Sequence, residues 1–347
     1  MPSTVTLFDL DLTERVIAWG QIEMIKTAQL GQGEMFTSEL VTVFENVDGA
    51  LTKAGPTSLV GGVDWYGENL TIQRDGITIF DGLVTDIQND ETARSATVVC
   101  ENIFKRPADK IIVSSGQRVN PAQAMLAILR SVMSDDLINV GSFNSAGARA
   151  LAAGAYITYK FLDADEVTVM AALNEIAQLS SLAVYVRDGL FHAEVFRPYQ
   201  GNSSDLRFPI TDAIVRQWGV LHWDTANFFN QVRVGYTADD YVLRTDSESV
   251  RINKTTRELP FDGEAAVVSH DENSAIYFCR TVLERVSVQR ALLNVAAGVE
   301  LWNTKLGDRY PITHARQGLS SFPMEVVEVR PKLDREDVEL SLAELVE

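Results

Sequence analysis

Residues 324–329 read MEVVEV and residues 338–345 read VELSLAEL, and apolar and polar residues take turns in both runs. This alternation is typical of strands with one buried face. Upstream, Leu306-Gly307-Asp308 leads into a third alternating run, residues 309–314, and then into a loop that contains glycine. The sequence therefore predicts that the chain ends in a closing β-meander, and this meander contains no catalytic motif.

The composition limits the class of protein. A chain of 347 residues is long enough for two or three domains. It contains no apolar run of about 18 residues, so we expect no transmembrane helix, and its first residues lack the features of a secretory signal. The formal net charge of −18 argues against a protein that grips the phosphates of nucleic acid. The dispersed acids indicate a solvated acidic surface or, as a sharper alternative, a surface that repels passing DNA.

The first segment, residues 1–113, is predicted to form a small β-barrel domain. Short alternating runs recur through it, and a hairpin is expected between Asn69 and Ile87. The hairpin turns at Asp75-Gly76, because that pair supplies the positive φ of a two-residue turn. A strand from Ser95 to Cys100 completes the set.

The second segment, residues 114–204, changes to a helical period and is predicted to be an α+β insert. Asn120-Pro121-Ala122-Gln123 is a strong helix start, in which Asn caps, Pro occupies the first position and Gln reaches back to the cap. Further helices are expected over residues 144–153 and 166–180. A hairpin that turns at Asp188-Gly189 follows, and residues 201–204 read as a linker.

The third segment, residues 205–347, returns to β structure and is predicted to form a second β-barrel domain. Residues 230–236 read as a strand, whereas residues 242–267 are polar and read as a long irregular excursion. A helix is expected after a capping box at Ser269-His270-Asp271-Glu272. The predicted fold class is thus mainly β, with two small tube-like β-barrel domains flanking a helical α+β insert.

The residues that usually carry chemistry are scattered. The two cysteines, Cys100 and Cys279, read as buried free thiols. The acids of Asp163-Ala164-Asp165-Glu166 lack the later ligands of a calcium loop and fit a helix N-terminus better. The remaining candidates are explained by structural roles in strands, helix caps, loops or turns. They are His192, His222, His270, His314, Gly31-Gln32-Gly33, Glu45 with Asp48, and Asp334 with Glu336 and Asp337. We therefore predict no catalytic residue, no cofactor and no metal site.

Aromatic residues gather in one part of the third segment. Trp218 and Trp223 flank His222, and Phe228 and Phe229 follow closely. Core or domain-interface packing explains such a group. The functional alternative is a partner interface or a sugar contact, because aromatic residues dominate binding hot spots.

Three features, in this order, resemble the tail-tip (baseplate) hub proteins of tailed bacteriophages. The first is the hairpin of residues 70–87 with its Phe80-Asp81-Gly82-Leu83-Val84 strand, and the second is Asn227 to Tyr236, which is similar to the start of the second barrel of those proteins. The third is the helix of residues 275–285, followed by a strand, Leu306-Gly307-Asp308 and the closing meander. The resemblance covers nearly the full chain. Because the chain stops at Glu347 without an appended lysozyme, peptidase or needle domain, a cell-wall-cleaving role is not expected.

The resemblance implies a structural virion protein of the phage tail tip, assembled in the host cytoplasm, and not an enzyme. It implies a homotrimer whose two barrels per chain form a pseudo-sixfold ring on the distal tail or tail tube protein. The ring would bind the tape-measure protein, anchor a central fibre or spike and open for DNA ejection. Specific nucleic-acid binding and stable membrane insertion are not implied. Two alternatives stay open: a secreted or surface glycan-binding β-module, and the hub of a contractile injection system or gene-transfer particle.

Overall fold

The computed structural model of the chain describes residues 3–7, 10–20, 22, 24–25, 39–52, 67–74, 76–103, 105–187, 189–195, 205–262, 266–335 and 337–345. The predicted turn residues Asp75 and Asp188, the linker at 201–204 and Gly31-Gln32-Gly33 lie outside these ranges. Within the described ranges, no helix combines the length and the apolar character of a membrane span.

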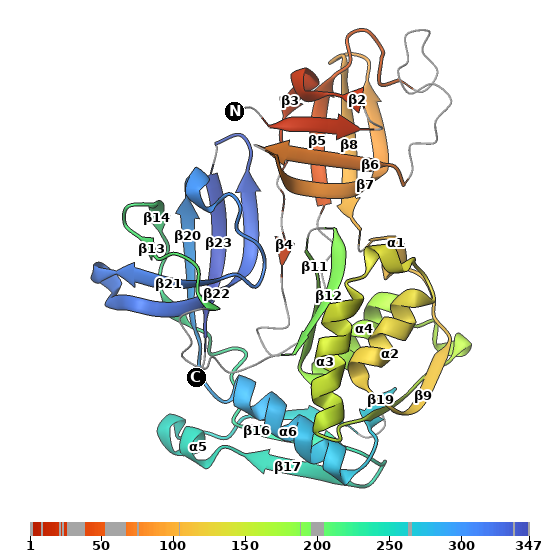
Figure 1. Cartoon of the computed structure of the whole chain (residues 1–347), viewed down its shortest axis with the longest axis vertical. Coiled ribbons are helices and arrows are strands. Elements are labelled where there is room, and N and C mark those ends of the chain that lie inside the picture. The colour runs from red at the N-terminus through yellow and green to blue at the C-terminus, as the bar shows by residue number, and fades with distance from the viewer. Residues whose placement is uncertain are drawn as a thin grey trace.

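The first segment forms a curled, barrel-like sheet with the strand order β2-β1-β6-β7-β8-β5-β3 (Figure 1, red and orange). Its strands are β1 (Thr4–Leu7), β2 (Leu10–Asp11), β3 (Val16–Ala18), β5 (Glu39–Glu45), β6 (Asn69–Arg74), β7 (Ile77–Asp90) and β8 (Ser95–Asn102). The predicted hairpin is confirmed, because β6 and β7 pair in antiparallel register with Asn69 opposite Leu83. Every second side chain of β5 is buried, so the alternation in the sequence marks the inner face of this sheet.

The insert contains three α-helices and four strands among the described residues, and a short helix, α1 (Lys105–Ala108), precedes it. Its elements are β9 (Ser114–Val119), α2 (Pro121–Arg130), α3 (Val140–Ala152), β10 (Ile157–Phe161), α4 (Val169–Ser180), β11 (Leu182–Arg187) and β12 (Leu190–Val195). Asn120 caps α2 as predicted, its side chain accepting hydrogen bonds from the N–H groups of Ala122 and Gln123. The Gln123 side chain does not reach back to the cap; it donates to Asn144 of α3 at 3.1 Å.

The start of α4 corrects the prediction for the acidic run. Thr168 caps α4, so the helix begins after the acids and not among them. Asp163 and Asp165 lie in a separate 3-10 turn, which ends at Glu166 with φ of 46°. The acids therefore do not form the first turn of an α-helix, because the chain turns between them and Thr168, where α4 begins.

The end of the chain, together with β13 and β14, forms a second barrel-like sheet with the order β13-β21-β22-β23-β20-β14 (Figure 1; β13 and β14 in green, the other strands in blue). Its strands are β13 (Ile210–Thr211), β14 (Val215–Trp218), β15 (His222–Trp223), β20 (Ala291–Ala297), β21 (Arg309–His314), β22 (Leu319–Lys332) and β23 (Asp337–Glu344). The predicted closing meander is confirmed by the antiparallel pairs β21–β22 and β22–β23. The mainly β fold class, with barrel-like sheets flanking an α+β insert, is likewise confirmed.

Side chains bridge the seam between the two ends of this second sheet. His314, at the end of β21, stacks on Trp218 of β14 with ring centroids 4.2 Å apart. Its Nδ1 lies 2.7 Å from a carboxylate oxygen of Asp212, which follows β13. Gln317 donates to the carbonyl of Gly219 at 2.7 Å. The edge strands β13 and β14 are thus tied to the same corner, which favours a nearly closed sheet.

Residues 231–286 depart most from the sequence prediction. They form β16 (Gln231–Gly235), β17 (Tyr241–Thr245), α5 (Ser247–Asn253), β18 (Glu258–Phe261), β19 (Val267–Ser269) and α6 (Glu272–Val286). The predicted irregular excursion is therefore regular over most of its length. The helix cap is Asp271, which accepts from the N–H of Ser274 at 2.8 Å, and not Ser269, which belongs to β19.

The strand that was expected to open the second barrel lies elsewhere. β16 pairs with β17 and β18 in a separate three-stranded sheet, and β19 pairs with β10 of the insert. The buried residues Val232, Val234 and Phe278 share one core cluster with the helices of the insert. The domain boundaries at residues 113 and 204 stay a proposal. Residues 231–286 lie beyond the boundary at 204 but pack with the insert.

The two barrel-like sheets share part of one core. Trp302 and Leu333 come from connections of the second sheet, yet both are buried in the apolar cluster of the first sheet. The guanidinium carbon of the buried Arg74, at the end of β6, lies 4.7 Å from the centroid of the Trp302 ring. The first segment likewise contributes to the second sheet, because its short strand β4 (Met24–Ile25) pairs with β22.

Replacing Trp302 with Ala should lower the free energy of unfolding by about 3 kcal/mol, because it removes a large buried ring and leaves a cavity between the sheets. Urea unfolding followed by circular dichroism measures this. Trp223→Ala is the matched control, since Trp223 is 53% exposed, and should cost less than about 0.5 kcal/mol. Equal effects of the two substitutions would contradict the shared core.

The cysteines should be unreactive in the folded protein. Both thiols are buried and unpaired as predicted, and burial raises the pKa of Cys100 to about 12 and that of Cys279 to about 11. At pH 8 the thiolate, which is the reactive form, is therefore scarce and inaccessible. A dithiopyridine assay should titrate no thiol in the native protein and both thiols in urea; rapid native labelling would show that the cores open.

Candidate functional site

A charged cleft lies between the insert and the second sheet. It encloses about 510 Å³ and is lined by α3, the β11–β12 hairpin, residues 205–207 and residues 307–309. Arg149, Arg187, Arg207 and Arg309 reach it from four separate segments. Glu194, Asp205 and Asp308 supply three carboxylates to the same cleft. The site is thus an ionic joint between segments that are far apart in sequence.

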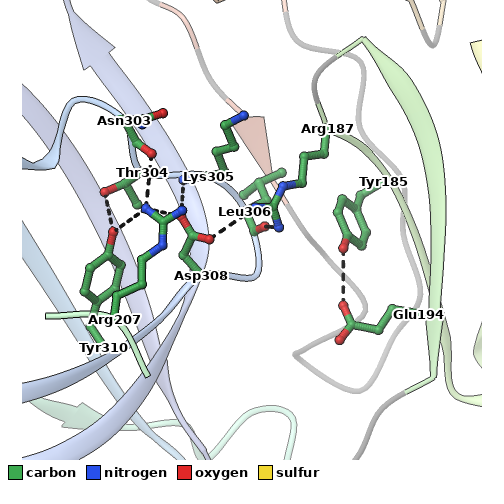
Figure 2. Close-up of polar contacts among 10 residues, drawn as sticks. All are labelled: Tyr185, Arg187, Glu194, Arg207, Asn303, Thr304, Lys305, Leu306, Asp308 and Tyr310. Atoms are coloured by element: carbon green, nitrogen blue, oxygen red, sulfur yellow. Dashed lines mark hydrogen bonds and ion pairs between the residues drawn. The ribbon is translucent and has the colours of Figure 1, made fainter. Parts of the chain in front are cut away.

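Asp308 is the centre of this joint (Figure 2). It is 6% exposed, and its Oδ2 accepts from the backbone N–H of Lys305 at 2.7 Å. Its carboxylate also lies 3.3 Å from Nη2 of Arg187 and 3.1 Å from Nη1 of Arg207. The neighbouring Gly307 has φ of 80°, a conformation that favours glycine and lets the chain turn here. The Leu306-Gly307-Asp308 motif therefore forms one wall of the site.

The ion pairs at the opposite wall are long. The Tyr185 hydroxyl donates to Glu194 at 3.3 Å (Figure 2). Arg309 lies 3.9 Å from Glu194 through Nη2 and 3.7 Å from Glu325 through Nε. Charge-assisted hydrogen bonds between guanidinium and carboxylate are typically about 2.7–2.9 Å. The Arg309 pairs are therefore longer electrostatic contacts and not bidentate hydrogen bonds.

Tyr310 supports Arg207 from below. Its hydroxyl lies 2.8 Å from Oγ1 of Thr304 and 3.4 Å from Nη1 of Arg207, which also donates to the carbonyl of Asn303 at 3.3 Å (Figure 2). Burial raises the pKa of the Tyr310 phenol, so the ring stays neutral at physiological pH. Arg207 is thus held by neutral oxygens and by Asp308.

Ser142 and His192, which line the cleft, connect neighbouring elements of the insert. The Ser142 hydroxyl donates to the carbonyl of Asn139 at 2.7 Å and accepts from the N–H of Ala193 at 3.0 Å, which ties α3 to β12. The His192 ring stacks on Tyr185, and its Nδ1 lies 3.4 Å from the Asn139 amide nitrogen. The Ser142 hydroxyl is thus engaged with two backbone groups, which is a structural role. Over the described part of the chain, no group of three His, Cys, Asp or Glu side chains is placed to hold a metal ion.

The four aromatic residues predicted as a partner interface are not brought into one surface. Trp223 is 53% exposed, whereas Phe228 is 2% exposed. Trp218 is stacked on His314, and Phe229 lies under the guanidinium group of Arg257, with the ring centroid 5.1 Å away. The interface role of these residues stays a prediction.

The other candidates from the sequence lie apart from the cleft, except His192. His222 is exposed in β15, a two-residue strand that pairs with β20. His270 lies 3.2 Å from the Thr158 hydroxyl. Arg15 donates two hydrogen bonds to Asp48, which lowers the pKa of that carboxyl to about 2. Asp337 pairs with Arg216, and Glu336 lies outside the described residues.

Similarity to known proteins appears in structure and not in sequence. The fold matches a tail protein from Neisseria meningitidis over 99% of this chain and 97% of that chain, with a TM-score of 0.59 and 12% identity. It matches a 43 kDa tail protein of a Shewanella oneidensis prophage over 99% and 98%, with a TM-score of 0.57 and 11% identity. No family model matches the chain, and no curated protein matches it by sequence.

A third match comes from a secretion system. An Escherichia coli component of the type VI secretion system, described as structurally similar to the T4 bacteriophage tail proteins gp27 and gp5, matches with a TM-score of 0.52 and 10% identity. The match covers 99% of this chain and 76% of that chain. The resemblance drawn from the sequence is thus confirmed at the level of the fold, which is that of phage tail proteins along the whole chain.

Replacing Asp308 with Asn should lower the free energy of unfolding by about 2 kcal/mol, because Arg187 and Arg207 lose a buried counter-charge while Lys305 keeps an acceptor. Thermal and urea unfolding measure the change. Asp334→Asn is the matched control: Asp334 pairs with Arg335 at 3.5 Å on the surface and should change stability by less than about 0.5 kcal/mol. A neutral Asp308→Asn result would show that this joint is not stabilising.

Proposed function

We propose that this protein is a structural component of a phage tail tip, namely a homotrimeric hub at the end of the tail tube. The observation that carries the proposal is the full-length match to phage tail proteins, which spans both barrel-like sheets and the insert. On this proposal the role is assembly and not catalysis. It locates the protein in the virion, at the tip of the tail.

Two barrel-like sheets in each chain support a threefold arrangement. Three copies would place six such sheets around the tail axis, so a trimer could meet a sixfold tube through nearly equivalent contacts. The shared core at Trp302 and Leu333 supports this geometry, because it holds the two sheets of one chain at one angle. A pair of sheets that rotated freely could not present a regular ring.

The hub would join several tail components. We propose that the ring caps the tail tube or distal tail protein, receives the end of the tape-measure protein, and anchors a central fibre or spike. Opening of the ring would release DNA. A net charge of −18 supports passage of DNA without specific binding, because acidic walls repel the phosphates.

A hub of a contractile injection system is the second candidate. The specific observation in its favour is the match to the type VI secretion component, which also extends along nearly the whole chain. The two candidates differ in the particle that carries the hub and not in the geometry of the ring.

Sedimentation velocity and negative-stain imaging of the purified protein test the proposal. We expect a particle of trimer mass, with averages that show threefold symmetry and a six-lobed outline. A monomer at the highest soluble concentration would contradict the homotrimer. A monomer that also binds immobilised glycans would favour a glycan-binding module instead.

A further inference from the structure

We propose that the cleft between the insert and the second sheet binds an acidic segment of a partner protein, whose carboxylates lie between the guanidinium groups of Arg149, Arg187, Arg207 and Arg309. The inference rests on the proposed function, because a hub has protein partners to hold. It adds to that function a site on this chain and the chemistry of the segment that fits there.

The first argument is the convergence of arginines in an acidic molecule. The chain has 48 acidic and 30 basic residues, yet four arginines from α3, β11, residue 207 and β21 meet around one cavity. A fold that needed only to join the insert to the second sheet could do so with apolar contacts, as the two sheets do at Trp302. Guanidinium groups around an open cleft are suited to bind carboxylates.

The second argument is that the existing ion pairs leave room for new partners. The pairs of Arg309 measure 3.9 and 3.7 Å. The side chains of Arg207 and Arg309 are 37% and 21% exposed. Each guanidinium carries five N–H donors in a fixed fork. Incoming carboxylates can therefore form shorter bonds with Arg309 and can reach the exposed part of Arg207.

The third argument separates a peptide from a nucleic acid. Glu194 and Asp205 also line the cleft, so a continuous chain of phosphates would meet fixed negative charges among the arginines. A peptide spaces its carboxylates with neutral amides, which the Ser145 hydroxyl and the His192 ring can face. The volume of about 510 Å³ suits a few side chains of such a segment.

Fluorescence anisotropy with a labelled hexaglutamate peptide tests the site in the full-length protein at low ionic strength. Hexaglutamate should bind, and binding should weaken as salt is added. Arg149→Gln and Arg309→Gln should each raise the Kd about fivefold. Glu194→Gln should lower the Kd, because it removes the carboxylate that competes for Arg309. Arg251→Gln is the matched control, since Arg251 is exposed on α5 and pairs with Glu248, and it should leave the Kd unchanged.

Several outcomes would overturn the proposal. These are an absence of hexaglutamate binding, equal binding of hexalysine, a Glu194→Gln variant that binds no better, or an Arg251→Gln variant that weakens binding as much as the cleft variants. Tighter binding of a single-stranded DNA oligonucleotide to the same arginines would show that the ligand of the cleft is a nucleic acid and not a peptide. Melting curves confirm that each variant is folded. The trimer mass, measured on the same samples, tests the proposed function separately, because the peptide assay does not depend on it.

Discussion

The packing of Trp302 beneath the guanidinium group of Arg74 is the contact on which the arrangement of the two sheets depends. Trp302 belongs to a connection of the second sheet but packs in the core of the first. In turn, β4 belongs to the first segment but pairs with β22 of the second sheet. Each sheet thus lacks part of its packing without the other. Because an apolar joint loses its burial when it opens, the two sheets behave as one body. The order of the sheets around a tail axis would follow from this fixed pair.

The joint between the insert and the second sheet has the opposite character. It is built from arginines and carboxylates around a cavity, with Asp308 as its buried centre. Polar joints remain accessible to water and to other charged groups, and they tolerate an exchange of partners that an apolar core does not. The same chain therefore uses an apolar contact where the geometry must be constant and an ionic contact where a ligand can enter.

Local signals in the sequence predicted the local structure. The alternation in residues 324–345 marked the buried faces of β22 and β23, and Asn120 followed by Pro121 marked the start of α2. The prediction failed where the outcome depends on distant contacts. Residues 231–235 read correctly as a strand but join the sheet that packs on the insert, and alternation carries no information on which sheet a strand joins. The cleft was missed for the same reason, since its four arginines lie on separate segments, and only Leu306-Gly307-Asp308 stood out.

Three arginines of this acidic chain are buried at joints between its segments. Arg74 is buried at the joint of the sheets, and Arg285 and Arg290 are buried where α6 meets β20. Burial lowers the pKa of Arg285 to about 9 and that of Arg290 to about 10, which still leaves both cationic at neutral pH. These three cations are thus withdrawn from the surface, where 48 acidic residues already outnumber 30 basic ones in the chain. If three copies surround the tail axis as proposed, DNA would meet walls whose acids are only partly compensated at the surface, and these three buried arginines would not be available to hold it.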